Sequence, residues 1–472
     1  MTDRRPNVVL ILSDDHGYAD RSRTGVHADV HTPGLDRLAA GGVECTQAYV
    51  TAPICSPSRA GLVAGRHQAR WGVYWFGDSA FPYAYPSIAE RFGDLGYATG
   101  YLGKVHYGKE TVGDRACPPH HGFAETFYGL AGQQLGRLNY LHHSQAAVEE
   151  YGPEASWRMA VQPMLSGDDP VELEGFLTAE LGRRARDFVE RHVDDPFFLQ
   201  LSFNAVHNFC WQLPPDELAR RGLPVRSDWS GDGPADYADW YDGSISPNLE
   251  HGRQYYLAQL ELMDAEIARL LDTLDARGLA EDTVVVYLTD NGGSTCNYAD
   301  NTPLRGTKYT LWEGGIRVPF LLRWPAGGIE GGRTCSGVLS SMDLYPSLLA
   351  AAGAEAAAYV DCDGVDQLAL WRGEAAAGHA ALHWDIGFSW AVRSGDWKLA
   401  WTDPDSTAAA YLRSSEHAEP GSGMRLFDLG SDPGETTDLV TERPDVVAEL
   451  RALRAGWLAE VGLAADPGER DR

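Results

Sequence analysis

Continuous runs of apolar and β-branched residues recur along the chain, as expected for strands that are buried on both faces of a parallel sheet. These runs cover residues 8–12, 97–103, 196–203 and 283–289. Stretches with a helical pattern lie between them, at residues 32–39, 86–95, 177–192 and 255–277. Thr32 is the expected N-cap of the first helix. The alternation predicts an α/β fold with a large mixed, mostly parallel sheet sandwiched by helices.

The pattern changes near residues 354–380, which are rich in Ala and Gly. With 472 residues, the chain exceeds the roughly 250–300 residues at which single cores stop growing. We therefore expect a main domain at residues 1–375 and a smaller α+β subdomain at residues 376–472. An antiparallel sheet and a closing helix are predicted for the subdomain, at residues 390–401, 426–429 and 445–461.

Two segments show no clean periodicity. Residues 105–175 contain many Gly, His, Tyr and Pro, and they are predicted to form loops over the functional site. Residues 209–250 carry many aromatic side chains, which either stack on a sugar ring or aryl group or pack a lid loop. The lid packing is favoured for any single ring. These aromatic residues are Trp211, Trp229, Tyr237, Trp240 and Tyr241.

Oxygen-bearing side chains directly follow two of the predicted strands. Asp14 and Asp15 come after the first strand, and Asp290 and Asn291 after the strand at 283–289. Open α/β sheets bind ligands at the carboxyl ends of their strands, and adjacent carboxylates repel one another unless a cation lies between them. The four residues therefore suggest a site for a hard divalent metal, and oxygen-only ligands argue against zinc or copper. For the two aspartates alone, an acidic turn in solvent is an equal alternative.

Residues 53–66 place a nucleophilic side chain at the expected start of a helix. Cys55 stands two residues before Pro57, and proline is tolerated in the first helical turn. A helix start presents unpaired N–H groups and a partial positive charge, and Arg59 adds a permanent cation. This arrangement indicates a nucleophile in a cradle for an anion. A buried free cysteine near a turn is the alternative.

Basic side chains follow two further strands. Lys104 and His106 stand at the end of the strand at 97–103, and alternate residues of an extended segment share a face. His207 follows the strand at 196–203, where it suits a proton donor to a leaving group. A solvated lysine beside a surface histidine is the ordinary alternative.

Three blocks of this sequence together resemble the sulfatase family. Residues 55–66 contain Cys-x-Pro-Ser-Arg followed by Ala-Gly-Leu-x-x-Gly-Arg, residues 303–308 read Pro-Leu-Arg-Gly-x-Lys, and residues 313–319 read Glu-Gly-Gly-Ile-Arg-Val-Pro. The resemblance implies an alkaline-phosphatase-like fold in which the main domain is catalytic. It also implies that Cys55 is oxidised to formylglycine by a formylglycine-generating enzyme, and that the hydrate of this aldehyde attacks the sulfur of a sulfate ester.

The resemblance also implies roles for individual residues. Arg59 and the metal would stabilise the ionised hydrate, and Lys104 and Lys308 would hold the sulfuryl oxygens. His207 would also contact the substrate and protonate the departing alcohol, and His106 would take a proton from the remaining hydroxyl. The sequence departs from the family at Phe209, where a proline is usual, and this puts the shape of the adjacent pocket in doubt. The implied ligands of the ion, Ca²⁺ or alternatively Mg²⁺, are Asp14, Asp15, Asp290, Asn291 and the residue made from Cys55.

Charge and composition limit the kinds of partner that the protein is expected to bind. With 39 basic and 67 acidic side chains, the net charge is −28, which disfavours nucleic acid and acidic membrane surfaces. The apolar run that ends before Asp14 is too short for a signal-peptide core or a membrane span, so we expect a cytoplasmic protein. The odd number of 7 scattered cysteines shows no disulfide or zinc framework.

The combined pattern predicts hydrolysis of a sulfate ester, with a sulfated carbohydrate or an aryl sulfate as substrate. A phosphonate monoester or phosphodiester hydrolase with the same site is the nearest alternative. A sulfuryl or phosphoryl transferase would need an acceptor other than water. A non-enzymatic metal-binding or carbohydrate-binding module with an unmodified Cys55 would leave two lysines and two histidines at strand ends unexplained.

Overall fold

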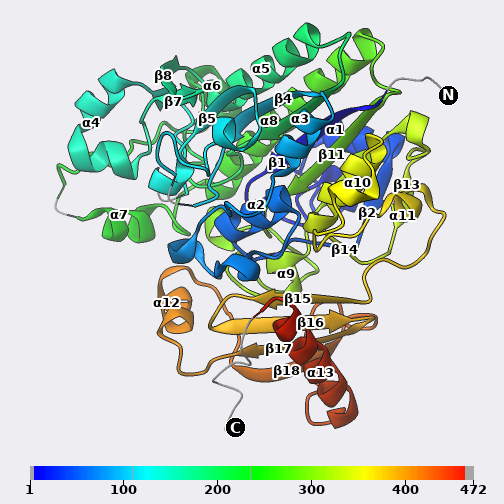
Figure 1. Cartoon of the computed structure of the whole chain (residues 1–472). Helices are drawn as coiled ribbons and strands as arrows, with labels where there is room; N and C mark the ends of the chain where they lie inside the picture. The colour runs from blue at the N-terminus through cyan, green and yellow to red at the C-terminus, as the bar shows by residue number, and fades with distance from the viewer. Residues whose placement is uncertain (1–4, 109, 135, 234, 463–472) are drawn as a thin grey trace.

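A ten-stranded mixed sheet forms the centre of the molecule in the computed structural model, which describes residues 5–108, 110–134, 136–233 and 235–462 (Figure 1). The strand order is β13-β2-β12-β11-β1-β10-β4-β5-β7-β8. The five strands from β11 to β5 are parallel to their neighbours, whereas β12 and β7 run antiparallel to the strands beside them. The strands are β1 (Asn7–Ser13), β2 (Val43–Cys45), β4 (Ala98–Lys104), β5 (Glu125–Gly129), β7 (Met164–Ser166), β8 (Asp169–Val171), β10 (Phe197–Ser202), β11 (Thr283–Thr289), β12 (Phe320–Arg323) and β13 (Arg333–Cys335). The predicted α/β class is confirmed.

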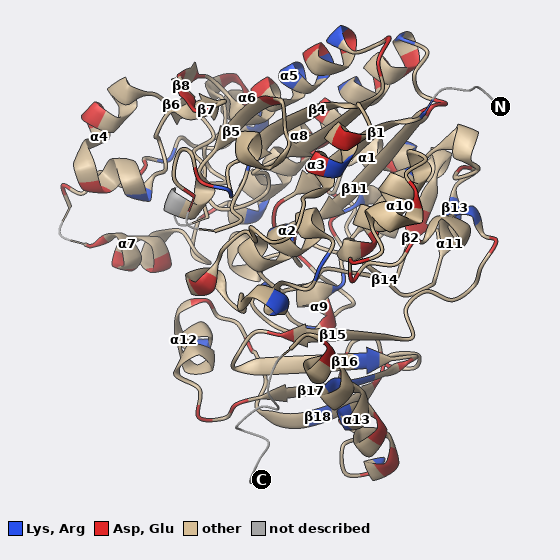
Figure 2. Ribbon diagram, viewed as in Figure 1, with Lys and Arg blue, Asp and Glu red and all other residues tan. Residues whose placement is uncertain are grey.

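Helices cover both faces of this sheet, and alternate residues of β1 enter the two resulting cores. Val9 and Ile11 pack in the core between the sheet and α1 (Pro33–Gly41), α5 (Leu177–Arg191) and α8 (Gly252–Ala276). Val8 and Leu10 pack in the opposite core, with α2 (Cys55–Ala64), α3 (Ile88–Asp94) and α10 (Leu344–Ala351). Figure 2 shows that the central strands are almost free of charged residues, which lie mainly on the outer helices and loops. Burial on both faces explains why these strands read as continuous apolar runs.

The start of α1 differs from the prediction. Thr32 occupies the N-cap position, but its side chain makes no capping hydrogen bond. Instead the carboxylate of Asp264, on α8, accepts hydrogen bonds from the backbone N–H groups of Gly34 and Leu35, at 2.7 and 2.8 Å. The Thr32 hydroxyl pairs with Ser22. A distant carboxylate thus replaces the local cap.

The prediction of loops at residues 105–175 was wrong in part. This region contributes β5, β7 and β8 to the edge of the sheet, a small pair of strands β6 (His142–His143) and β9 (Leu173–Glu174), and α4 (Gln145–Arg158). Non-helical backbone at Gly152, followed by Pro153, kinks α4. The kink and the very short strands removed the periodicity from the sequence.

The C-terminal part forms a separate four-stranded antiparallel sheet, in the order β15-β16-β17-β18, with α13 (Pro444–Glu460) against it (Figure 1, orange and red). Buried Lys398 of β17 lies between Glu313 and Glu435, at 3.0 and 2.9 Å, and so ties this sheet to α9 (Glu313–Ile316). The sheet comprises β15 (Ala381–Asp385), β16 (Ser389–Ser394), β17 (Trp397–Thr402) and β18 (Gly423–Asp428), and α12 (Thr407–Ser415) lies between the last two strands in the chain. The predicted domain boundary after residue 375 falls between α11 (Leu368–Arg372) and β15, and it stays a prediction. Within the described ranges, no helix combines the length and apolar character needed to cross a membrane.

Candidate active site

The predicted site residues converge at the carboxyl ends of four adjacent strands. Asp14 and Asp15 follow β1, and Asp290 and Asn291 follow its parallel neighbour β11. On the other side of β1, His207 lies beyond β10, and Lys104 ends β4. These positions agree with the general rule for ligand sites in open α/β sheets.

Cys55 is the first residue of α2 and is buried against Asp14. Its Sγ lies 3.4 Å from an Asp14 carboxylate oxygen. Burial, together with the charges of Asp14 and Asp290, raises the pKa of the Cys55 thiol well above its usual value. Since the thiolate is the nucleophilic form of cysteine, an unmodified Cys55 is a poor nucleophile here.

Three carboxylates and three cations form a buried cluster around Cys55. Asp14 pairs with Lys104, Asp15 lies 2.9 Å from Lys308, and Asp290 lies 2.7 Å from Arg59. All six side chains are at most 3% exposed. Their formal charges cancel, as burial of ionised groups requires.

Two features of the cluster fit an oxygen-preferring divalent cation. Burial and the neighbouring Asp290 raise the pKa of Asp14 to about 7, which indicates an excess of negative potential at that carboxylate. The Asn291 amide donates to Asp15 at 2.7 Å, while its own oxygen is buried and has no hydrogen-bond partner among the described residues. Atoms of Asp14, Asp15, Cys55 and His207 that could bind a metal lie within 4.8 Å of one another. The predicted ligands Asp290 and Asn291 adjoin this group through their hydrogen bonds to Asp15.

The two histidines flank the cluster. His207 is 7% exposed, and its Nε2 lies 2.9 Å from the Lys308 ammonium. Burial and the positive charges of Lys308 and Lys104 lower the pKa of His207 well below its usual value. Burial and the charge of Lys104 do the same for the pKa of His106. Both histidines are therefore neutral in the free protein.

The prediction that Lys104 and His106 share one face of an extended segment was wrong. β4 ends at Lys104, and His106 has a left-handed backbone with φ of 59°, so the segment is not extended. His106 still lies at the site, because the charges of Lys104, Arg59 and Lys308 all act on it. Its buried Nδ1 has no hydrogen-bond partner in the described ranges.

The departure at Phe209 has a local explanation. Phe209 is buried and has φ of 69°. Proline is restricted to φ near −65° and could not adopt this conformation. The Phe209 ring packs against Trp211, with centroids 5.4 Å apart. The chain after His207 therefore follows a path that a proline would not allow.

The aromatic residues of 209–250 mainly pack against one another. Trp211 and Trp229 are buried, and their indole N–H groups donate to Asp228 and to the backbone of Ala235. Tyr237 stacks on Tyr241, with centroids 5.7 Å apart. This supports packing as the role of most of these rings.

Three residues near His207 and Lys308 were missed by the sequence reasoning. They are Arg137, Tyr309 and Glu416, whose charges or rings act on the Lys308–His207 pair. Tyr309 follows Lys308 directly, but Arg137 lies in the aperiodic region and Glu416 at the end of α12. No pattern in the sequence connects the latter two with the strand ends.

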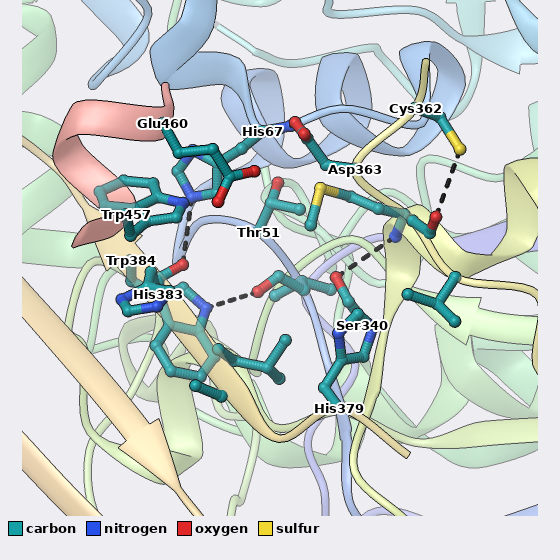
Figure 3. A pocket seen from close by; sticks show the side chains of 16 residues that line it. Thr51, His67, Ser340, Cys362, Asp363, His379, His383, Trp384, Trp457 and Glu460 are labelled. Atoms are coloured by element: carbon teal, nitrogen blue, oxygen red, sulfur yellow. Dashed lines mark hydrogen bonds between the residues drawn. The ribbon is translucent and has the colours of Figure 1, made fainter. Parts of the chain in front are cut away.

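A separate cavity of about 320 Å³ lies between the main domain and α13 (Figure 3). The Nε2–H group of His67 donates a hydrogen bond to the backbone oxygen of His383 at 3.1 Å, and the Trp457 ring contacts both imidazoles at 4.8 and 5.0 Å. Burial lowers the pKa of His67 to about 4 and that of His383 to about 3. None of the predicted site residues lines this cavity. His67 and His383 are therefore neutral groups that pack between the two parts, whereas His379 pairs with Asp343 at 2.7 Å.

Comparisons with known proteins extend over nearly the whole chain. The family model described as Sulfatase matches residues 6–354. Arylsulfatase A of Bos taurus is 31% identical over 476 residues, covering 95% of this chain and 86% of the relative. Steryl-sulfatase of Mus musculus is 30% identical over 526 residues, covering 93% and 79%. A crystal structure of Ps i-CgsB in complex with k-i-k-neocarrahexaose is 26% identical with a TM-score of 0.77, covering 96% of this chain and 93% of that chain.

Proposed function

The chain belongs to the sulfatase family and hydrolyses sulfate esters, and we propose that it does so with formylglycine made from Cys55 and with one divalent cation. The observation that carries the proposal is the position of Cys55 at the start of α2, inside a buried cluster of three carboxylates and three cations. The raised pKa of the thiol supports a modified nucleophile, because the unmodified side chain is protonated.

Asp14, Asp15, Asp290 and Asn291 would hold the cation, with Ca²⁺ expected and Mg²⁺ as the alternative. When bound, the cation would polarise the sulfuryl oxygens and favour the ionised form of the hydrate. Its two positive charges would give the otherwise balanced cluster a net charge of about +2. A sulfate monoester with one negative charge and an ionised hydroxyl of the hydrate would neutralise it.

The side chains of the cluster would each have a separate catalytic role. Arg59, held by Asp290, stabilises the ionised hydrate at position 55. One hydroxyl of the hydrate would attack sulfur, while Lys104 and Lys308 would neutralise the sulfuryl oxygens. The bond between sulfur and the alcohol oxygen breaks, and His207 gives that oxygen a proton. Burial and the charges of Lys308 and Lys104 lower the pKa of His207, and a bound anionic ester would oppose the effect of the two lysines.

Release of the product regenerates the aldehyde. His106 would take the proton from the second hydroxyl of the sulfated hydrate, so that the carbonyl would re-form as sulfate leaves. The unpartnered Nδ1 of His106 supports this role, because a buried imidazole nitrogen without a partner can accept a proton.

The first test is the mass of the tryptic peptide that ends at Arg59, from protein made in its native host. We expect the aldehyde or its hydrate in place of the Cys55 thiol. Cys55→Ala should abolish sulfate ester turnover while the melting temperature is unchanged, and Cys210→Ala, at a buried cysteine outside the cluster, should retain turnover. Full activity with Cys55 present only as a thiol would refute the mechanism. An unmodified thiol in folded protein without activity would instead favour the metal-binding module.

Monoanionic phosphodiesters and phosphonate monoesters carry the same charge as a sulfate ester, so the cluster does not reject them on charge. Parallel measurement of kcat/KM for an aryl sulfate, a phosphodiester and a phosphonate monoester separates these activities, and the sulfate should be preferred. Maturation by a formylglycine-generating enzyme and a cytoplasmic location stay predictions. Co-expression with such an enzyme and fractionation of the source cells test them.

A further inference from the structure

Arg137 stands beside the two catalytic histidines. It follows Gly136, where an added Cβ would lie 2.7 Å from Cε1 of His106. Its guanidinium lies over the rings of Tyr237, at 4.8 Å, and of Phe209, at 5.8 Å. It also donates a hydrogen bond to the Tyr237 hydroxyl. The Arg137 head group is thus fixed in place by aromatic contacts rather than by a carboxylate.

The hydrogen-bonding capacity of Arg137 is not used up. Its buried Nε has no partner within the described ranges, and those ranges contain no ion pair to this side chain. Its charge adds to burial and to those of Lys308 and Lys104 in lowering the pKa of His207. The guanidinium therefore lies within electrostatic reach of the proton donor.

Glu416 approaches the same place from the C-terminal part of the chain. Its backbone oxygen accepts a hydrogen bond from Cys296 at 2.5 Å, in the turn that follows the Asp290 loop. Next to Cys296, Asn297 donates to Asn208, the neighbour of His207, at 2.7 Å. These contacts fix the position of Glu416 beside the catalytic cluster.

The Glu416 carboxylate is partly buried without a cation of its own. In the part of the chain that the structure describes, it forms no salt bridge and accepts no hydrogen bond. Burial raises the pKa of Glu416, and the charges of Lys308 and Arg137 oppose this effect. The Glu416 carboxylate and the Arg137 guanidinium thus both lie within electrostatic reach of the Lys308–His207 pair, where the sulfate ester would bind.

An aromatic wall adjoins the two charges. The Tyr309 ring centroid lies 5.4 Å from the Lys308 ammonium, Trp75 lies 6.0 Å from Tyr309, and Phe388 lies 5.3 Å from Trp75. All three rings are partly exposed. A flat aryl group, a steroid or the apolar face of a sugar can stack on such a wall, so the wall alone does not choose among them.

The charges of Arg137 and Glu416 distinguish among these alcohols. A steroid or simple aryl alcohol would remove water from Arg137 and Glu416 without replacing its hydrogen bonds, which is unfavourable. A sugar offers hydroxyl groups that donate to the carboxylate and oxygens that accept from the guanidinium. We propose that Arg137 and Glu416 bind the hydroxyl-rich alcohol of the ester, so that the preferred substrate is a sulfated sugar. This proposal rests on the proposed function, because it assumes sulfate at Lys308 and His207.

The test compares formylglycine-containing wild type with Glu416→Gln and Arg137→Met. The probes are 4-nitrophenyl sulfate, a steroid sulfate, and the 6-sulfates of galactose, glucose and N-acetylglucosamine. Wild type should turn over at least one sugar sulfate with higher kcat/KM than the steroid sulfate. Each variant should lower the ratio of kcat/KM for that sugar to kcat/KM for 4-nitrophenyl sulfate by about 10- to 100-fold, as loss of a hydrogen bond to a charged group does.

Glu419→Gln is the matched control, because Glu419 is an exposed carboxylate three residues away, and it should leave the ratio unchanged. Thermal unfolding shows whether each variant is folded. An unchanged ratio in both folded variants overturns the proposal, as does a wild-type preference for the steroid sulfate. Turnover of 4-nitrophenyl sulfate without any sugar sulfate overturns the proposal but retains the proposed function. Fully converted wild type that hydrolyses none of the probes overturns both.

Discussion

Replacing Lys308 by methionine should strengthen binding of the divalent cation while it abolishes hydrolysis. The Lys308 ammonium lies 2.9 Å from Asp15, one of the expected metal ligands. A cation bound by Asp15 would therefore sit close to a positive charge that is buried with it. Methionine retains the length and apolar volume of the side chain and removes only this charge.

The size of the effect follows from Coulomb's law. A single and a double positive charge about 5 Å apart repel each other by roughly 7 kcal/mol at an effective dielectric constant of about 20. Relaxation of the site and entry of water at the position of the removed ammonium cancel much of this. Breaking a buried ion pair typically lowers the free energy of unfolding by about 3–5 kcal/mol. We expect a net gain in Ca²⁺ affinity of about 10- to 100-fold, or about 1.4–2.7 kcal/mol.

Isothermal titration of metal-free protein with Ca²⁺ at pH 8.5 measures the affinity, since the pKa of Asp14 is about 7 and its carboxylate is then ionised. The deficit in unfolding free energy of Lys308→Met should shrink when Ca²⁺ is added, because a ligand stabilises the state that binds it. Lys398→Met is the matched control: it also breaks a buried pair, but with Glu313, which is not one of the expected metal ligands. It should lose stability without a change in Ca²⁺ affinity. A folded Lys308→Met that binds Ca²⁺ no more tightly than wild type would refute the reasoning.

Three further predictions concern the framework. His383→Gln should make the stability of the fold less sensitive to acid. Burial lowers the pKa of His383 from 6.5 to about 3, so its contribution to the free energy of unfolding is complete above pH 6.5 and declines as the pH falls. Between pH 7 and pH 5, the free energy of unfolding in urea should fall by about 2 kcal/mol less in the variant than in wild type. Asp264→Asn removes a carboxylate oxygen from the two backbone N–H groups at the start of α1, at 2.7 and 2.8 Å, and should lower the free energy of unfolding by about 1–3 kcal/mol in urea titrations. At Gly136, where φ is 76°, an alanine side chain would clash with His106, so Gly136→Ala should lower kcat by about 10- to 100-fold. Gly25 has a similar φ of 66° but lies in open space, so Gly25→Ala should affect stability alone. Equal kcat values for the two variants would contradict this.

The strand-end chemistry could be predicted because it is local in the sequence. Each candidate directly follows an apolar run, and the register of the strands then determines which ends meet. Ser13 pairs with Thr289, Leu12 pairs with Ser202, and Ser202 pairs with Gly103. The residues that follow these pairs therefore reach one edge of the sheet. The type of strand was enough to predict this convergence without any knowledge of the loops.

Features that depend on contacts between distant segments could not be predicted in this way. The cap of α1 comes from Asp264, more than 200 residues after Thr32, and local capping rules do not consider it. The position of His106 depends on a φ of 59° that follows β4, whereas the alternation rule assumes that the strand continues. The kinked α4 contains Gly152 and Pro153, which are read as loop signals.

The same distinction separates the reaction from the choice of substrate. Most residues assigned to the chemistry follow or end β1, β4, β10 and β11 or lie in the first half of α2, with Lys308 in a loop as the exception. A shift of one residue in strand pairing would turn the strand-end residues away from the site. Arg137, Tyr309 and Glu416 lie on segments whose paths the strand register does not determine. Changes in the segments of Arg137 and Glu416 can therefore alter the alcohol that is accepted without moving the groups that act on sulfur. A chain that swaps Glu416 and its flanking residues for an uncharged loop should keep hydrolysis of 4-nitrophenyl sulfate and lose its preference for sugars, and a loss of both activities in a folded variant would show that the two functions are not separable.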